Sequence, residues 1–254
     1  MRKPFVAGNW KMNMNTLSSA KLAEGVRAGT NGVAGSKVDV ALIPPFVYIP
    51  AAVNALRATD IAVGAQDVYF ETEGAFTGEI SPAMLKDIGC TYVLCGHSER
   101  RHVIGETDEM INKKVTAAIN GGLLPILCVG ELLQERQAEK TEEVVVRQIK
   151  KGMAGLSPEK ASAVTIAYEP VWAIGTGLTA PPAQAQDVHK LIRNLIADMY
   201  GRELADDIRI QYGGSAKPSN AAELMAKEDV DGLLVGGASL KSDEFNAIII
   251  AALK

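Results

Sequence analysis

Short apolar runs alternate along the chain with longer stretches in which apolar residues recur every three to four positions. Runs of this length, apolar on both faces, are typical of β-strands in a parallel sheet that is covered by helices. We predict strands at 5–10, 38–43, 61–66, 91–96, 123–129, 163–168, 208–212 and 231–236.

The stretches between these strands have the period of amphipathic helices. The clearest is 182–200, where one buried helix face is expected. Its apolar positions are Val188, Leu191, Ile192, Leu195, Ile196 and Met199. Another helix is expected to begin at Ser81-Pro82, a cap residue followed by proline in the first turn, and to end before Gly89.

Eight strand–helix units in 254 residues have the size and rhythm of a closed (β/α)8 barrel. The predicted fold class is therefore α/β, with one domain over residues 1–254, since no Pro/Ser-rich linker divides the chain. An open doubly wound sheet is the structural alternative that the same alternation permits.

Composition narrows the classes of function. The chain is 47% hydrophobic, and its formal net charge of −4 is spread without blocks of like charge. A concentrated basic patch, the mark of nucleic-acid binding, is missing from the sequence. No apolar run reaches the length of a membrane span, and the apolar run near the start is too short for an export signal. The expected partner is a small molecule or another protein.

Cys90, Cys95 and Cys128 all lie in or beside apolar runs. An odd number of cysteines without a C-x-x-C pair indicates reduced thiols and a cytoplasmic protein. Cys128 is expected to pack in the core close to the site, and not to act as a nucleophile.

Polar residues collect where the predicted strands end. In a (β/α)8 barrel the working residues lie at this end, on the loops after the strands. The strand ends carry Asn9, Lys11, Gln66-Asp67, "GHSERR" (96–101), "CVGE" (128–131), "YEP" (168–170), "YGGS" (212–215) and "VGGAS" (235–239).

Side-chain parity predicts which of these residues face the barrel mouth. Alternate residues of a strand share a face, so if Ile166 and Tyr168 face the helices, Glu169 points inward. His97 and Lys11 can then converge on Glu169 from other strands. An acid, an imidazole and an ammonium group around one cavity suit proton transfer next to a carbonyl, with the carboxylate as base.

Three glycine-containing segments are candidates for the other half of the site: 175–177, 213–215 and 236–239. Without bulky side chains, their backbone N–H groups can approach an anion, and the last segment precedes a helical stretch. The loops after strands 7 and 8 are the usual phosphate seat of this fold.

Several residues and motifs have simpler interpretations. Glu99 is expected to support Lys11 or His97, while His102 and His189 are expected to be structural. "GTGLTA" (175–180) matches a dinucleotide fingerprint, but it does not follow its strand directly. No zinc-deaminase pattern and no nucleotide P-loop is present.

The motifs together resemble the triosephosphate isomerase family over the whole chain. They are "GNWKMN" (8–13), "GAFTGEIS" (74–81), "GHSERR" (96–101), "AYEPVWAIGTG" (167–177), "QYGGS" (211–215) and "LVGGASL" (234–240). The resemblance implies the TIM-barrel fold and the interconversion of dihydroxyacetone phosphate and D-glyceraldehyde 3-phosphate, without metal or cofactor.

The resemblance also implies a role for each matching position. Glu169 is the base that moves the proton, His97 is the electrophile at the enediolate oxygens, and Lys11 binds the substrate electrostatically. The remaining positions are Asn9 at the oxygen site, Ser98 and Glu99 as supporting residues, and the phosphate-binding backbone of Gly175, Ser215, Gly236 and Gly237.

The segment after Glu169 resembles the mobile lid of the family. Pro170 to Trp172 correspond to its first hinge and Gly175 to Gly177 to its tip. The chain departs from the family at Leu178, in the second hinge, where lysine is usual, at Met14, where glycine is common, and at Asp67, where asparagine is usual.

The polar loop 66–80 is long for a compact domain. In the family this loop inserts into a second subunit, with Thr77 reaching the region of Asn9 and Lys11. The resemblance therefore implies a homodimer whose isolated subunit is poorly active.

Two alternative functions stay open at this point. The first is a catalytically inactive barrel that binds a phosphate ligand, against which the presence of Lys11, His97 and Glu169 argues. The second is an isomerase or epimerase for a larger phosphosugar, which the whole-chain resemblance disfavours.

Overall fold

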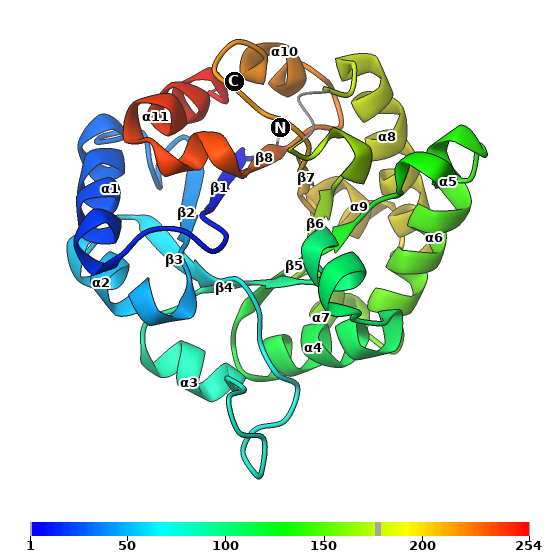
Figure 1. Ribbon diagram of the computed structural model, residues 1–254. Helices are drawn as coiled ribbons and strands as arrows, with labels where there is room; N and C mark the ends of the chain where they lie inside the picture. The colour runs from blue at the N-terminus through cyan, green and yellow to red at the C-terminus, as the bar shows by residue number, and fades with distance from the viewer. Residues whose placement is uncertain (1, 176–178, 254) are drawn as a thin grey trace.

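The computed structural model describes residues 2–175 and 179–253, and their eight strands form one closed barrel (Figure 1). Every strand is parallel to its neighbours, and β8 pairs with β1, Gly232 lying opposite Phe5. The strands are β1 (Phe5–Asn9), β2 (Asp39–Ile43), β3 (Ile61–Ala65), β4 (Tyr92–Cys95), β5 (Leu124–Val129), β6 (Thr165–Tyr168), β7 (Ile210–Tyr212) and β8 (Gly232–Val235). The predicted (β/α)8 fold is confirmed, and the open sheet is excluded.

Helices surround the barrel on its outside (Figure 1). The α-helices are α1 (Thr16–Gly29), α2 (Ile49–Ala55), α3 (Pro82–Asp87), α4 (Asp108–Asn120), α5 (Leu133–Gln137), α6 (Thr141–Gly152), α7 (Pro158–Ala161), α8 (Pro182–Tyr200), α9 (Arg202–Asp207), α10 (Ala221–Met225) and α11 (Ser242–Ala251). Four short helical turns follow strands: η1 (Phe46–Tyr48), η2 (Arg100–Ile104), η3 (Val171–Ala173) and η4 (Gly237–Leu240).

The predicted helix boundaries hold for α3 and α8. The Ser81 hydroxyl accepts a hydrogen bond from Met84 N–H, and α3 begins at Pro82 as expected. Gly89 follows with a φ of +94°, a conformation that glycine adopts without strain. None of the described helices combines the length and the apolar character that crossing a membrane requires.

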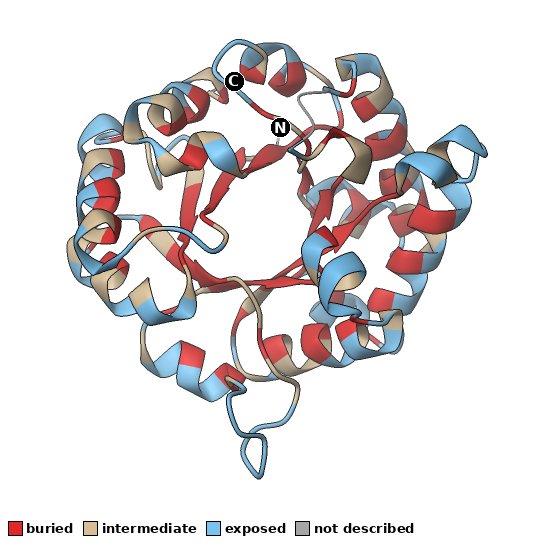
Figure 2. Ribbon diagram, in the orientation of Figure 1, coloured by how far each residue is buried: buried red, intermediate tan, exposed pale blue. Residues whose placement is uncertain are grey.

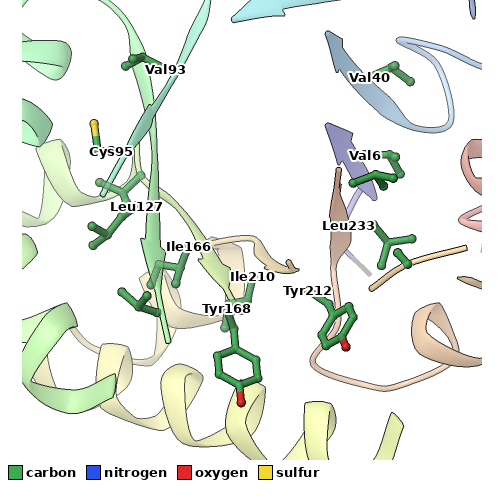
Figure 3. Packing of buried hydrophobic residues seen from close by; sticks show 14 of the residues in the cluster. Val6, Val40, Val93, Cys95, Leu127, Ile166, Tyr168, Ile210, Tyr212 and Leu233 are labelled. Carbon is green, nitrogen blue, oxygen red and sulfur yellow. The ribbon is translucent and has the colours of Figure 1, made fainter. Parts of the chain in front are cut away.

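The strands are buried (Figure 2), and apolar side chains form two clusters around them. The larger layer fills the space between the sheet and the helices and includes Ile166 and Tyr168 (Figure 3). The smaller layer fills the inside of the barrel and includes Ala167 and Cys128. The predicted parity of β6 is therefore correct, and it places the residue after Tyr168 on the inner side.

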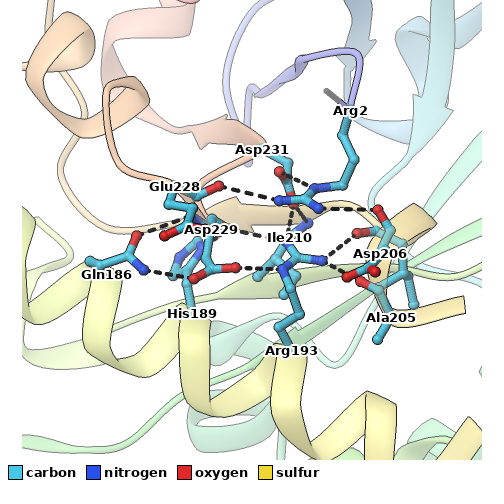
Figure 4. Close-up of polar contacts among 11 residues, drawn as sticks. Arg2, Gln186, His189, Arg193, Ala205, Asp206, Ile210, Glu228, Asp229 and Asp231 are labelled. Atoms are coloured by element: carbon cyan, nitrogen blue, oxygen red, sulfur yellow. Dashed lines mark hydrogen bonds and ion pairs between the residues drawn. The ribbon is translucent and has the colours of Figure 1, made fainter. Parts of the chain in front are cut away.

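A buried polar network joins α8 to the residues at the amino ends of β7 and β8 (Figure 4). Arg193 donates from Nε to Asp229 over 2.6 Å and from Nη2 to Asp231 over 2.5 Å. Asp231 also accepts from Ile210 N–H, at the start of β7, over 2.9 Å. His189 belongs to this network, because its Nδ1 lies 3.1 Å from the Asp229 carbonyl oxygen. Burial lowers the pKa of His189 to about 4, so this histidine is neutral and structural.

Replacing Arg193 with leucine is expected to lower the free energy of unfolding by about 3–5 kcal/mol, because Asp229 would stay buried without its ion-pair partner and Asp231 would keep only Arg2. Burial alone would raise the pKa of Asp229, but hydrogen bonds from Arg193 and Gln186 outweigh it and hold that pKa below its usual range. Such a carboxylate stabilises the fold above its unfolded pKa of about 3.9 and loses this contribution as the pH falls.

The destabilisation by Arg193→Leu is therefore expected to shrink as the pH falls below about 4, through the lowered pKa of Asp229, which urea unfolding at a series of pH values measures. Lys190→Leu, on the exposed face of α8, is the control and is expected to change stability by less than about 0.5 kcal/mol. An effect of Arg193→Leu that is independent of pH would contradict the prediction.

Candidate active site

A cavity of about 480 Å³ opens at the carboxyl ends of the strands. Its lining brings together the polar residues predicted from separate strand ends. These are Asn9, Lys11, His97 and Glu169, together with Gly175, Ser215, Gly236 and Gly237. Closure of the barrel makes this possible, since β1, β4 and β6 end on the same rim.

Glu169 follows β6 directly and is 2% exposed. Its N–H donates to the Val129 carbonyl over 2.7 Å, which continues the pairing of β6 with β5. Two glycines leave room for it: a Cβ on Gly213 would lie 2.8 Å from Glu169 Cγ, and one on Gly130 would lie 1.7 Å from the Glu169 carbonyl oxygen. The position of the acid is thus set by the ends of the two neighbouring strands.

The Glu169 carboxylate has two direct partners. His97 Nε2 lies 3.0 Å from Oε1, and Ser98 N–H donates to Oε2 over 2.8 Å. Burial opposes the charged form, but His97, the Ser98 N–H group and Lys11 together hold the pKa of Glu169 below its usual range. Glu169 is therefore an ionised carboxylate at neutral pH, as a general base requires.

His97 is buried and oriented from both ring nitrogens. Its Nδ1 accepts from Glu99 N–H over 3.3 Å, so the Nε2 proton is the one that faces Glu169. Burial lowers the pKa of His97, but the Glu169 charge and hydrogen bond outweigh it and raise this pKa above its usual value. The imidazole presents a hydrogen-bond donor to the cavity.

Lys11 is held in an unusual backbone conformation, with a φ of +51°. Its N–H donates to Asn9 Oδ1 over 3.0 Å, and its carbonyl accepts from Gln66 Nε2 over 2.8 Å. The ammonium lies 2.6 Å from Glu99 Oε1. Glu99 Oε2 lies 3.6 Å from His97 Nδ1, so Glu99 contacts both Lys11 and His97. The sequence left open which of the two it would contact.

The opposite wall of the cavity is backbone-rich. η4 begins at Gly237, so the amino end of a helical turn lies at the wall. A Cβ on Gly237 would meet no atom within 4 Å, and one on Gly236 would only touch Lys11 Cε at 3.5 Å, so the wall stays open to a ligand. The amino end of a helical turn beside Lys11 makes this wall suited to an anion.

Other predicted residues lie around the cavity in different ways. Ser98 contributes its backbone N–H to Glu169. Cys128 is fully buried inside the barrel, and burial raises the pKa of its thiol well above the usual value, so it has no nucleophilic character. Thr77 is exposed on the loop that projects away from the barrel in Figure 1, and it does not line the cavity of its own chain.

The segment after Glu169 is described up to Gly175, and Thr176, Gly177 and Leu178 lie outside the described residues. Glu131, to which the sequence assigned no role, anchors its first part. Its fully buried carboxylate accepts from Tyr168 Oη over 3.1 Å and from Trp172 Nε1 over 3.0 Å. The only signal in the sequence was its place after β5.

Gln66 is the second residue whose role the sequence did not reveal. It was noticed at the end of β3, but its contacts with Lys11 and with the Ile43 carbonyl, 3.1 Å away, join loops that are distant in sequence. Met14, where the family often has glycine, has a φ of +80°, which is the left-handed conformation that glycine favours.

A buried carboxylate–imidazole pair, a neighbouring ammonium group and an anion-binding wall at the mouth of a (β/α)8 barrel define an isomerase-type site for a small phosphorylated sugar. Comparison with known proteins makes this specific. The family model described as Triosephosphate isomerase matches residues 4–252. The chain belongs to the triosephosphate isomerase family.

Relatives from several bacteria cover almost the whole chain. The triosephosphate isomerase of Carboxydothermus hydrogenoformans is 56% identical over 249 residues, 98% of either chain. That of Thermoanaerobacter pseudethanolicus is 52% identical over 98% of this chain and 99% of its own. That of Rhodopirellula baltica is 50% identical over 99% of this chain and 98% of its own.

Replacing Glu169 with glutamine is expected to lower the pKa of His97. The substitution removes the charge that raises this pKa and leaves the burial that lowers it. Protonation of His97 should then occur at lower pH than in the unaltered protein, as followed by ¹⁵N-detected NMR of the imidazole. An unchanged or higher pKa would show that the Glu169 contact does not control the titration of His97.

Proposed function

We propose that this chain catalyses the interconversion of dihydroxyacetone phosphate and D-glyceraldehyde 3-phosphate, the reaction of glycolysis and gluconeogenesis that gives its family its name. The observation that carries the proposal is the direct contact of Glu169 with His97 beside Lys11, around one cavity, in a full-length member of the family. The reaction is an intramolecular oxidoreduction: hydrogen moves between two carbons of one molecule, and no external oxidant or reductant is consumed.

Glu169 is the base. Its ionised carboxylate removes a proton from the carbon next to the carbonyl and returns it to the neighbouring carbon. To reach the substrate carbon it has to leave His97 Nε2 and Ser98 N–H. The same movement frees the Nε2 proton for the oxygens of the enediolate, so His97 becomes the electrophile as Glu169 becomes the base.

Charge that develops on the oxygens is stabilised by fixed groups. Lys11 supplies an ammonium group at the cavity, and Asn9 holds Lys11 through its N–H group. The phosphate binds on the backbone of Gly175, Ser215, Gly236 and Gly237. This arrangement needs neither a metal ion nor an organic cofactor, because each step is a proton transfer or a charge contact.

Exclusion of water protects the intermediate. An exposed enediolate would expel phosphate, so the segment that begins at Pro170 acts as a lid in this proposal. Val171 N–H donates to the Glu131 carbonyl over 3.1 Å, and Trp172 donates to the Glu131 carboxylate. Glu131 therefore fixes the first residues of the lid next to Glu169.

The proposal is tested by Glu169→Ala, which is expected to lower kcat by about 10³- to 10⁴-fold while the protein stays folded. A coupled assay in both directions measures kcat, and circular dichroism measures folding. Glu159→Ala, on the exposed side of α7, is the matched control and is expected to leave kcat unchanged. A natively folded, unaltered protein without isomerisation would instead favour an inactive barrel that binds a phosphate ligand.

We propose also that the enzyme is a cytoplasmic homodimer joined through the loop 66–80. The root of the loop is fixed, because Asp67 pairs with Lys114 over 2.7 Å and with Arg100 over 2.9 Å. Beyond it, Tyr69, Phe70 and Phe76 form a cluster of aromatic rings, and Phe76 is 39% exposed. A rigid, partly apolar projection of this kind suits insertion into a second copy, where Thr77 reaches the region of Asn9 and Lys11.

Exposed apolar residues elsewhere in the chain are candidates for the surface that receives the loop. They are Met12, Leu17, Phe46, Val47, Met84, Val103 and Ile104. Free and buried cysteines agree with the reducing compartment in which the proposal places the enzyme.

Replacing Thr77 with arginine is expected to weaken the dimer and to lower kcat/KM, because the loop tip would no longer fit beside the partner's active site. Sedimentation and kinetics over a dilution series measure association and activity together, and activity per subunit should fall as the dimer dissociates. Full activity of a monomeric sample would contradict the proposed dependence on dimerisation.

A further inference from the structure

Gln148 makes two hydrogen bonds to one residue beside the active site. It lies on α6 and is 2% exposed. Its Oε1 accepts from Gly130 N–H over 2.7 Å, and its Nε2 donates to the Gly130 carbonyl over 3.3 Å. A buried amide that satisfies both groups of one residue fixes that residue against the helix.

Gly130 needs such a partner because the sheet ends just before it. The pairing of β5 with β6 stops at Val129 opposite Tyr168. The backbone N–H and C=O of a buried residue are costly to leave unpaired, and Gln148 supplies the bonds that a neighbouring strand would otherwise supply. The glutamine side chain thus holds Gly130, the residue after β5, by hydrogen bonds of the kind that hold the strand itself.

Gly130 in turn lies directly against Glu169. A Cβ at this position would be 1.7 Å from the Glu169 carbonyl oxygen, so the two backbones are in contact. The residues on either side of Gly130 hold the same segment: Val129 accepts from Glu169 N–H over 2.7 Å, and Glu131 accepts from Val171 N–H over 3.1 Å. A shift of Gly130 therefore moves the backbone that carries the Glu169 carboxylate.

We infer that Gln148 is a positioning residue for the isomerisation, acting on Glu169 through Gly130. This inference rests on the proposed function, in which Glu169 is the base. Gln148 is not among the described residues that line the cavity, so it is not placed to contact a substrate there. Its contribution is to hold the carboxylate at the distance from the substrate carbon at which proton transfer is fast.

The test is Gln148→Met, which keeps the length of the side chain and removes both hydrogen bonds. We expect kcat to fall by about 10- to 100-fold, since a displacement near 1 Å has that effect, with KM within about twofold of its original value. The matched control is Asn112→Leu. Asn112 donates to the carbonyls of Gly152 and Ala154 over 3.1 and 3.0 Å at the carboxyl end of α6, and its loss should reduce stability without changing kcat.

A second pair of variants separates positioning from general stability. In a Glu169→Ala background, Gln148→Met is expected to cause no further loss of kcat, because no base is left to position. An unchanged kcat in folded Gln148→Met, or an equal loss in Asn112→Leu, would overturn the inference. If Gln148→Met does not fold, Gln148→Glu, which keeps the acceptor for Gly130 N–H, replaces it: a severalfold loss of kcat supports the inference, and none overturns it.

Failure of this inference and failure of the proposed function are distinguishable. If activity survives in Glu169→Ala, Glu169 is not the base and the proposed mechanism is wrong. If activity is lost in Glu169→Ala but normal in Gln148→Met, the mechanism stands and only the positioning role of Gln148 is wrong.

Discussion

The hydrogen bonds between β8 and β1 close the sheet, and every property of the site depends on this closure. Lys11, His97 and Glu169 are far apart in sequence and lie on the same rim only because parallel strands of a closed barrel all end on one side. The same closure buries Glu169 and His97 together, so that each controls the charge of the other. The closed barrel therefore determines both where these residues lie and how their pKa values are shifted.

Most of the architecture could be predicted from local patterns, because each strand and helix carries its own signal. Alternation along β6 placed Tyr168 outside and Ala167 inside the barrel, and from this the inward direction of Glu169 followed. Polar residues and glycines at the strand ends were informative for the same reason: nothing in a purely structural loop requires them on one rim.

The contacts that orient the site could not be predicted from these patterns. Gln66, Glu131 and Gln148 contact residues from other elements. The sequence pattern around a buried glutamine or glutamate does not indicate which residue it will contact. The turn η2, directly after His97 and Glu99, likewise has no period that the sequence would reveal. Such side chains are chosen by the three-dimensional arrangement and not by the local chain, so they become visible only with coordinates.

The contact between Glu169 and His97 has a consequence for which ligands set the base free. In the proposed mechanism the oxygens of the substrate use the same Nε2 proton, so they have to displace the Glu169 carboxylate from it. The hydroxyl and carbonyl oxygens of a sugar phosphate are acceptors that can take the place of the carboxylate. A ligand that does not reach His97 leaves the carboxylate paired, so in the proposed mechanism release of the base is coupled to the binding of a ligand that carries such oxygens.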